Sequence, residues 1–143
     1  MVKVFVDTNI LVYTIDKHNL DKQNKALSIF SEAAKQNSLV ISTQVLQEFY
    51  NVMTGKMKMD KLKAKDVLQD MQDIETVLLN RDIIERAIDL NILEQISFWD
   101  SLIVAAAEYA NCEEILSEDL QDGRSIRGIK IVNPFKRKSS NKL

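Results

Sequence analysis

The sequence predicts an α/β fold in which a parallel sheet is covered by helices on both faces. Short runs rich in aliphatic and β-branched residues, such as residues 2–6 and 129–132, have the length of buried strands. Between such runs lie longer segments, such as residues 20–36, whose apolar side chains recur at helical spacing. Strands that alternate with helices are typical of a parallel sheet, because each helical crossover returns the chain to the same end of the sheet.

The elements can be assigned in chain order. Strands are predicted over residues 2–6, 39–41, 76–79, 115–116 and 129–132. Helices are predicted over residues 10–15, 20–36, 43–54, 61–74, 81–95 and 98–111. Thr43 is the expected cap of the third helix, and Gly55 its expected stop. The last helix is apolar nearly all round, so we expect it to be buried at the centre of the domain.

Composition limits the class of protein. The 143 residues suggest one domain over residues 1–135, followed after Pro134 by a basic tail over 136–143. The longest apolar run, residues 102–107, is far shorter than the ~20 residues that cross a bilayer, so we expect no membrane span. A single cysteine excludes an internal disulfide and indicates a reducing, cytoplasmic setting. One cysteine and one histidine (His18, expected at the surface) make a zinc site of Cys and His ligands implausible.

Four acidic residues lie where an apolar segment ends or a buried helix begins: Asp7, Glu48, Asp100 and Asp119. An unpaired buried charge costs several kcal/mol, so isolated carboxylates rarely occupy such places. Asp7 directly follows the first strand, and open α/β sheets bind ligands beyond the carboxyl ends of their strands. An Asx turn or a helix cap explains Asp7 equally well.

Glu48 and Asp100 fall on apolar sides of predicted helices. Val45 and Phe49 share a side with Glu48, so its carboxylate needs a cation or hydrogen-bond donors unless it reaches solvent at the edge of the stripe. Ser97 can cap the last helix with Asp100 at the third helical position, where the helix dipole favours a negative charge. A capping role and a metal-binding role for Asp100 do not exclude each other.

The fourth acid lies in an acidic turn over residues 117–123. Either Asp119 or Glu118 could be the ligand, whereas Asp122 precedes a glycine and is explained by turn chemistry. Two carboxylates ~4 Å apart repel each other by roughly 4 kcal/mol at an effective dielectric constant of about 20. A cluster of four would therefore require a cation, and ligands that are all oxygen favour Mg²⁺ or Mn²⁺.

Five short segments occur in a recognisable order: residues 5–9 (FVDTN), 42–49 (STQVLQEF), 98–103 (FWDSLI, leading into an alanine-rich helix), 116–120 (LSEDL) and 131–135 (IVNPF). Each segment is common by itself, but the order of all five is specific. Over nearly its whole length the chain therefore resembles the PIN-domain family of ribonucleases and, within it, the VapC-type toxins.

This resemblance implies a PIN-like three-layer sandwich, with a central parallel sheet of about four or five strands flanked by helices. It also implies a catalytic metal site for Mg²⁺ or Mn²⁺, with one or two ions. The implied ligands are Asp7, Glu48, Asp100 and Asp119. Assisting roles are implied for Thr8, Asn9 and Ser117, with Asp122 as a further accessory ligand. Ser117 stands where many relatives carry Thr, which keeps the hydroxyl.

The same resemblance implies an endoribonuclease that is the toxin of a type II toxin–antitoxin pair. Metal-activated water would attack the phosphodiester in line and leave a 5′-phosphate and a 3′-hydroxyl. The implied partners are RNA such as tRNA or rRNA, an antitoxin that blocks the acidic pocket with an arginine, and a second copy of the chain in a homodimer. A catalytically inactive RNA-binding or assembly module with the same fold is the alternative.

Two further enzyme classes fit less well. A receiver domain would need a second acid beside Asp7 and a lysine after a late strand, which the sequence does not offer in the right setting. A haloacid-dehalogenase-like phosphatase would need an aspartate where Asn9 stands.

RNA requires a basic surface, because phosphate contacts dominate affinity. Lysines are dense in the middle of the chain and in the tail: Lys56, Lys58, Lys61, Lys63, Lys65, Lys136, Arg137, Lys138 and Lys142. A solvated helix face and a solubilising tail explain them equally well. Trp99 could stack on an RNA base, but it adjoins the buried helix and we expect it in the core.

Overall fold

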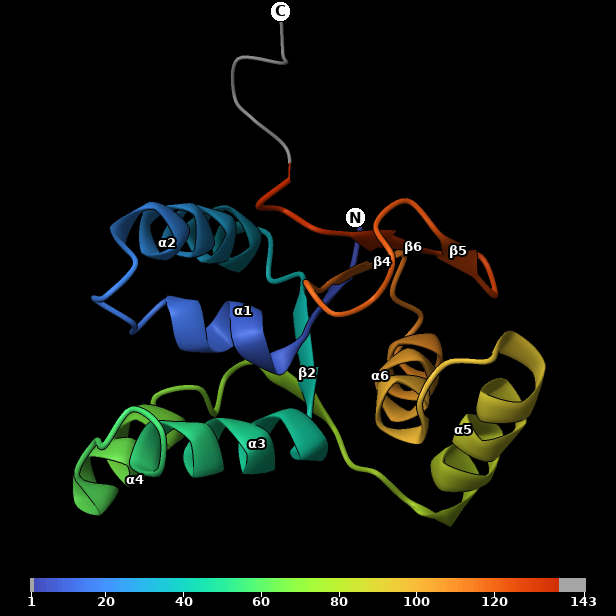
Figure 1. Cartoon of the computed structure of the whole chain (residues 1–143), viewed down its shortest axis with the longest axis horizontal. Coiled ribbons are helices and arrows are strands. Elements are labelled where there is room, and N and C mark those ends of the chain that lie inside the picture. Colours follow the sequence, from blue (N-terminus) through green and yellow to red (C-terminus); the bar gives the residue numbers. More distant parts are fainter. Residues whose placement is uncertain (1, 137–143) are drawn as a thin grey trace, which may run out of the picture.

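The computed structural model describes residues 2–136 and has one six-stranded sheet at its centre (Figure 1). The strand order is β3-β2-β1-β4-β6-β5. The strands are β1 (Val4–Val6), β2 (Leu39–Ser42), β3 (Glu75–Val77), β4 (Glu114–Leu116), β5 (Ser125–Ile126) and β6 (Ile129–Val132). All neighbouring pairs are parallel except β5 with β6. The predicted α/β class and the mostly parallel sheet are therefore confirmed.

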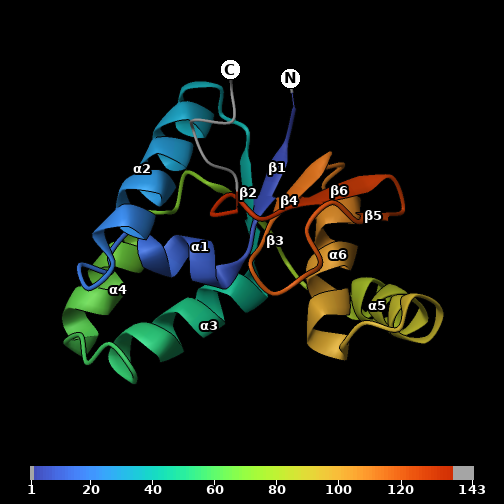
Figure 2. The same cartoon turned by 45° about the horizontal axis from the view of Figure 1, so that its top comes forward.

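Six helices flank the sheet. They are α1 (Thr8–Tyr13), α2 (Leu20–Lys35), α3 (Thr43–Thr54), α4 (Lys61–Gln69), α5 (Arg81–Glu94) and α6 (Phe98–Tyr109). Figures 1 and 2 place α1 to α4 on one side of the sheet and place α5 and α6, which pack against each other, on the other side. This is the three-layer arrangement that the sequence predicts, and all six helices overlap their predicted ranges.

Side-chain caps fix where the helices begin. Ser97 caps α6 as predicted, since its hydroxyl accepts a hydrogen bond from the Asp100 backbone N–H. The prediction of Thr43 as the cap of α3 is wrong, because the Ser42 hydroxyl accepts the bond from the Val45 N–H. The Thr43 hydroxyl instead accepts a bond from the backbone N–H of Leu79.

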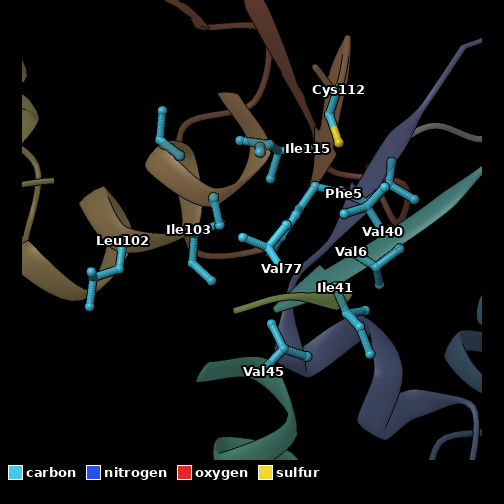
Figure 3. Packing of buried hydrophobic residues seen from close by; sticks show 14 of the residues in the cluster. Phe5, Val6, Val40, Ile41, Val45, Val77, Leu102, Ile103, Cys112 and Ile115 are labelled. Atoms are coloured by element: carbon cyan, nitrogen blue, oxygen red, sulfur yellow. The ribbon is translucent and has the colours of Figure 1, made fainter. Parts of the chain in front are cut away.

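The core lies where both helical layers meet the sheet. Phe5, Ile115 and Ile131 are fully buried on neighbouring strands, and residues 101–107 of α6 are all buried, as predicted. Figure 3 shows Phe5 and Val77 among the buried side chains between the strands and α6. The lone cysteine, Cys112, is also buried, and burial raises the pKa of its thiol to about 12.

The first turn of α6 is less buried than the middle of the helix. The prediction that Trp99 lies in the core is wrong, because its side chain is 64% exposed. Phe98, its neighbour, packs partly against the core instead. Trp99 lies in the first turn of the helix, ahead of the run of buried residues, so the apolar character of the helix as a whole did not predict its environment.

Two other elements differ from prediction. The sheet has one strand more than expected. The additional strand is β5, which is only two residues long and pairs with β6 through a tight turn. Arg127 and Gly128 both have positive φ in that turn, which matches the backbone twist of a two-residue hairpin. Helix α4 ends at Gln69 rather than at residue 74.

No helix in the described part of the chain is long and apolar enough to cross a membrane. Lys136 is the last described residue. The remainder of the predicted basic tail, including Arg137, Lys138 and Lys142, lies outside the described residues.

Because Phe5 is fully buried at the centre of the sheet, Phe5→Ala should lower the free energy of unfolding by about 3–5 kcal/mol. Urea denaturation followed by circular dichroism measures the change. Leu62, which is 74% exposed on α4, provides the control, since Leu62→Ala should change stability by less than about 0.5 kcal/mol. Similar losses for the two variants would contradict the assigned core.

Candidate functional site

Three separate segments meet at the carboxyl-terminal edge of the parallel strands. Asp7 follows β1, residues 117–119 follow β4, and α3 starts directly after β2. The starts of α1 and α3 and the loop after β4 lie together at this edge, with α6 beside them (Figure 2). The carboxyl edge of such a sheet is where ligands of open α/β folds bind.

A pocket of about 260 Å³ lies at this edge. It is lined by Asp7, Thr8, Asn9, Glu48, Asn51, Val52 and Asp119. Three of the four acids singled out in the sequence therefore line one small pocket. Asp100 does not line it, but its charge acts on Asp119 and raises the pKa of that carboxyl.

Asp7 is held in place by two hydrogen bonds. Its side chain is only 6% exposed. Its Oδ1 atom accepts a bond from the Thr8 backbone N–H at 2.7 Å, and its Oδ2 atom accepts one from the Ser117 hydroxyl at 2.8 Å. The Ser117 oxygen also accepts the backbone N–H groups of Asp119 and Leu120. Ser117 thus fixes Asp7 and shapes the turn that carries Asp119. Asp7 also caps α1, so its Asx-type capping role and its place in the pocket coexist.

Glu48 is oriented by two neighbours. The Thr8 hydroxyl donates to its Oε1 atom at 2.5 Å, and the Gln44 side-chain amide donates to its Oε2 atom at 3.4 Å. The same amide donates to the backbone carbonyl of Trp99 at 3.2 Å, which links α3 to the start of α6. The Oε1 atom of Gln44 is buried and has no hydrogen-bond partner among the described residues.

The structure separates the three acids of the turn after β4. Asp119 lines the pocket, and its Oδ2 atom accepts a bond from the Asn9 amide at 3.4 Å. Glu118 instead accepts bonds from the Tyr13 hydroxyl and the Lys22 ammonium. Asp122 accepts the backbone N–H of Asn133 at 2.8 Å and does not line the pocket, and its role as an accessory ligand stays a prediction.

The pocket raises the pKa of two carboxyls. Burial is the largest cause for Asp7 and raises its pKa to about 6, although the bonds from Ser117 and Thr8 act in the opposite direction. The charges on Asp119 and Glu48 raise it further. Burial also raises the pKa of Asp119, followed by the charges of Asp100, Glu118 and Glu48. The negative charges around the pocket therefore disfavour the ionised forms of Asp7 and Asp119.

A divalent cation would relieve this repulsion, and the available ligands suit one. Every candidate ligand is an oxygen, which hard cations such as Mg²⁺ prefer. Within residues 2–136, however, no three side chains of Asp, Glu, His or Cys lie close enough to ligate one ion together. Mg²⁺ keeps most of its water and is commonly bound through one or two carboxylates, so the pocket fits a hydrated ion better than a closed cage.

Sequence reasoning missed three residues of the site. Asn51 and Val52 complete the wall of the pocket, and Gln44 joins Glu48 to α6. Gln44 and Asn51 lie about one helical turn before and after Glu48, so helical spacing around that acid could have identified both. Helical spacing alone, however, does not distinguish these two polar side chains from the others on α3.

Comparisons with known proteins agree with the fold. The sequence model of the PIN domain family matches residues 4–121 of the chain. No curated protein sequence matches the chain significantly.

Solved structures of similar fold are toxins and toxin–antitoxin complexes. VapBC2 from Rickettsia felis, bound to a DNA fragment from its promoter, is 25% identical, with a TM-score of 0.66, over 92% of this chain and 97% of that one. A toxin–antitoxin complex from Klebsiella pneumoniae is 20% identical, with a TM-score of 0.68, over 92% and 98%. Mycobacterium tuberculosis VapC20, a toxin that cleaves the sarcin–ricin loop, is 16% identical, with a TM-score of 0.66, over 82% and 92%.

The raised pKa of Asp7 has a consequence for stability without metal. Because the carboxyl is harder to ionise in the folded state, the native protein loses stability as pH rises from about 4 to about 6 and does not regain this loss above it. The loss is up to about 3 kcal/mol, from the difference between the pKa of about 6 in the folded protein and the ordinary aspartate pKa of 3.8. Asp7→Asn should therefore raise the melting temperature in EDTA at pH 7.5, with a smaller gain at pH 4.5.

Asp89→Asn is the matched control, because it makes the same charge change on the exposed face of α5. It should leave the melting temperature nearly unchanged. A melting temperature of Asp7→Asn at or below that of the wild type at pH 7.5 would contradict the assigned electrostatic strain.

Proposed function

The chain belongs to the PIN domain family, and on this premise we propose that it is a divalent-metal-dependent endoribonuclease that hydrolyses RNA phosphodiester bonds. We further propose that it is the toxin of a type II toxin–antitoxin pair. The observation that supports the activity best is the meeting of Asp7, Glu48 and Asp119, from three distant segments, around one pocket at the carboxyl edge of the sheet.

In this proposal Asp7, Glu48 and Asp119 hold Mg²⁺ or Mn²⁺, and Asp100 adds negative charge from the start of α6. A divalent cation supplies Lewis-acid chemistry, since it makes a water molecule more acidic and neutralises charge that develops on the phosphate. Because Ser117 and Thr8 already fix the Asp7 side chain, it would need little further ordering when the cation binds. Glu48 is fixed in the same way by Thr8 and Gln44.

Neutral polar groups complete the proposed site. Thr8 and Asn9 donate hydrogen bonds to Glu48 and Asp119, which sets the direction of both carboxylates. The Asn51 side chain lines the pocket beside Glu48 and could position the phosphate or a water molecule. The only histidine, His18, forms its bonds with Asp16 and does not line the pocket, so no imidazole base is at hand among the residues that line it.

An RNA strand can extend from the pocket along α3. Lys56 and Lys58 lie just beyond the end of that helix, in the turn that leads to α4. Lys61, Lys63 and Lys65 follow on α4, and all five side chains are exposed. Positive charge on these exposed lysines would attract the backbone of neighbouring nucleotides, which supports RNA as substrate.

The partner is proposed from the comparisons. Two of the similar structures are toxin–antitoxin complexes, which supports a cognate antitoxin for this chain. We propose that a segment of the antitoxin covers the acidic pocket with an arginine, since this cation would pair with the clustered carboxylates. A structured RNA such as tRNA or rRNA is the proposed target, and the M. tuberculosis relative, which cleaves the sarcin–ricin loop, supports rRNA. A homodimer and a cytoplasmic location complete the proposal.

The alternative function is an inactive PIN-fold module that binds RNA or a protein partner. One observation favours it: no three acidic, His or Cys side chains in the described part of the chain are within ligating range of one ion. The strained carboxyls of Asp7 and Asp119 favour the nuclease instead, because an inactive module would gain stability by losing them.

Asp7→Asn and Asp100→Asn should each reduce RNA cleavage at least about 100-fold, because each removes charge that the metal requires, while circular dichroism spectra stay unchanged. A fluorescently labelled RNA incubated with Mg²⁺ measures the rate, and EDTA should abolish it. Asp89→Asn keeps the same net charge as these variants and should cleave as fast as the wild type. Full activity of Asp7→Asn would show that the acidic pocket is not the active site.

Mg²⁺ or Mn²⁺ should raise the melting temperature of the wild type, since binding to the folded state at 100 times the dissociation constant stabilises it by about 2.7 kcal/mol. Differential scanning fluorimetry with and without EDTA measures the shift. Asp7→Asn should lose most of it, whereas Asp89→Asn should keep it. A wild-type protein that shows no shift would favour the inactive module.

A further inference from the structure

Trp99, at the start of α6, is an exposed aromatic residue whose ring is not part of the packed core. Trp99 is the single tryptophan of the chain, and its side chain is 64% exposed. Tryptophan contributes the largest apolar surface of any residue and is normally buried for most of its area. Leaving this ring in water forgoes that stabilisation, so an exposed position needs a different explanation.

Trp99 is tied to the acidic pocket through its backbone. Its carbonyl oxygen accepts a hydrogen bond from the Gln44 amide at 3.2 Å, and the same amide donates to Glu48, which lines the pocket. The next residue is Asp100, in the first turn of the helix, whose backbone N–H donates to the Ser97 cap. The ring is therefore carried by a segment that is fixed relative to the proposed catalytic carboxylates.

The ring itself is also partly fixed. Phe98 packs against the core and contacts the Trp99 ring with its edge, with centroids 5.3 Å apart and an angle of 67° between the planes. An edge contact of this kind occupies little of the indole surface. A flat apolar surface thus remains open to solvent on a residue whose backbone is joined to the pocket through the Gln44 side chain.

We propose that Trp99 is a stacking site for an unpaired nucleobase of the RNA whose phosphodiester enters the acidic pocket, an inference that rests on the proposed nuclease function. Aromatic side chains bind splayed bases of single-stranded RNA by stacking, and each stacked base contributes about 1–3 kcal/mol. The lysines after α3 would bind phosphates beyond the pocket, and Trp99 would hold a base beside it. The two contacts would place the strand across the carboxylates.

A protein partner is the competing explanation for an exposed aromatic residue. The structure offers another surface for such a partner, because Ile84, Ile88 and Ile92 form an exposed stripe at helical spacing on α5. That stripe has no hydrogen-bonded link to the pocket among the bonds of the described residues, whereas Trp99 has one through Gln44. The link favours RNA as the ligand of Trp99.

The test compares wild type, Trp99→Ala, Trp99→Phe and Trp99→Leu in binding and in cleavage. Binding is measured in EDTA at low salt with a 12-nucleotide single-stranded RNA, by anisotropy of labelled RNA and by the intrinsic emission of Trp99. An abasic ribose-phosphate oligomer of equal length is the control ligand. Tyr109→Ala is the matched control variant, because Tyr109 is 56% exposed at the opposite end of the same helix.

We expect the RNA to quench Trp99 emission and the abasic oligomer to leave it unchanged. Trp99→Ala and Trp99→Leu should weaken RNA binding about 10-fold, Trp99→Phe should restore much of the loss, and Tyr109→Ala should bind like the wild type. In cleavage, Trp99→Ala should raise KM by a similar factor and change kcat little, since the carboxylates are untouched.

Unchanged emission with RNA, equal quenching by the abasic oligomer, or equal affinities of wild type and Trp99→Ala would each overturn the stacking site. Unchanged emission together with an altered oligomeric state of Trp99→Ala would assign the ring to a protein interface instead. The nuclease proposal can fail separately. If RNA binds and quenches Trp99 emission but is never cleaved, the nuclease activity is contradicted and the stacking site is kept. If RNA is cleaved and Trp99→Ala leaves KM unchanged, the stacking site is contradicted and the nuclease activity is kept.

Discussion

The hydrogen bond from Ser117 to the buried Asp7 carboxylate is the interaction on which the candidate site depends. Strands β1 and β4 are parallel neighbours with Val6 paired to Leu116, so the next residue of each strand emerges at the same level of the sheet. At that level the first strand supplies an acid and the other a hydroxyl donor. Because the same hydroxyl oxygen accepts the N–H of Asp119, one serine determines the positions of acids 112 residues apart in the chain.

This arrangement places the Asp7 carboxyl in a buried position where its ionised form is unfavourable. Two hydrogen bonds to Asp7 lower its pKa, yet burial and the charges of Glu48 and Asp119 outweigh them. The balance is therefore unfavourable for the ionised carboxyl in the absence of a cation. In the proposed function a bound cation would neutralise these charges and relieve the repulsion, so that function and stability would be coupled through the same carboxylates.

The sequence predicted the fold class and the helices well, because strong periodicity and capping residues are local signals. It missed β5, whose two residues carry too little pattern, and it named Thr43 instead of Ser42 as a cap, because both hydroxyl residues stand at the same boundary. Of the candidate site, Asp7 and Glu48 were indicated by a strand end and a helix face, whereas Asp119 was chosen over Glu118 only through the resemblance to the PIN-domain family. The roles of Gln44 and Asn51, and the separation of Asp119 from Glu118, depend on side-chain directions that no spacing rule gives.

The environment of Trp99 shows why an averaged property of a helix can mislead. Residues 101–107 are buried because the sheet and α5 cover the middle of α6, but the first turn extends past that cover. An apolar residue there either meets another surface or remains in water. Phe98 takes the contact with the core, and its neighbour is left facing outward beside the acid that begins the helix. A tryptophan in that position is costly for a domain that only needs to fold. The cost is explained if the surface is covered when substrate binds, because stacking then buries the ring in the complex.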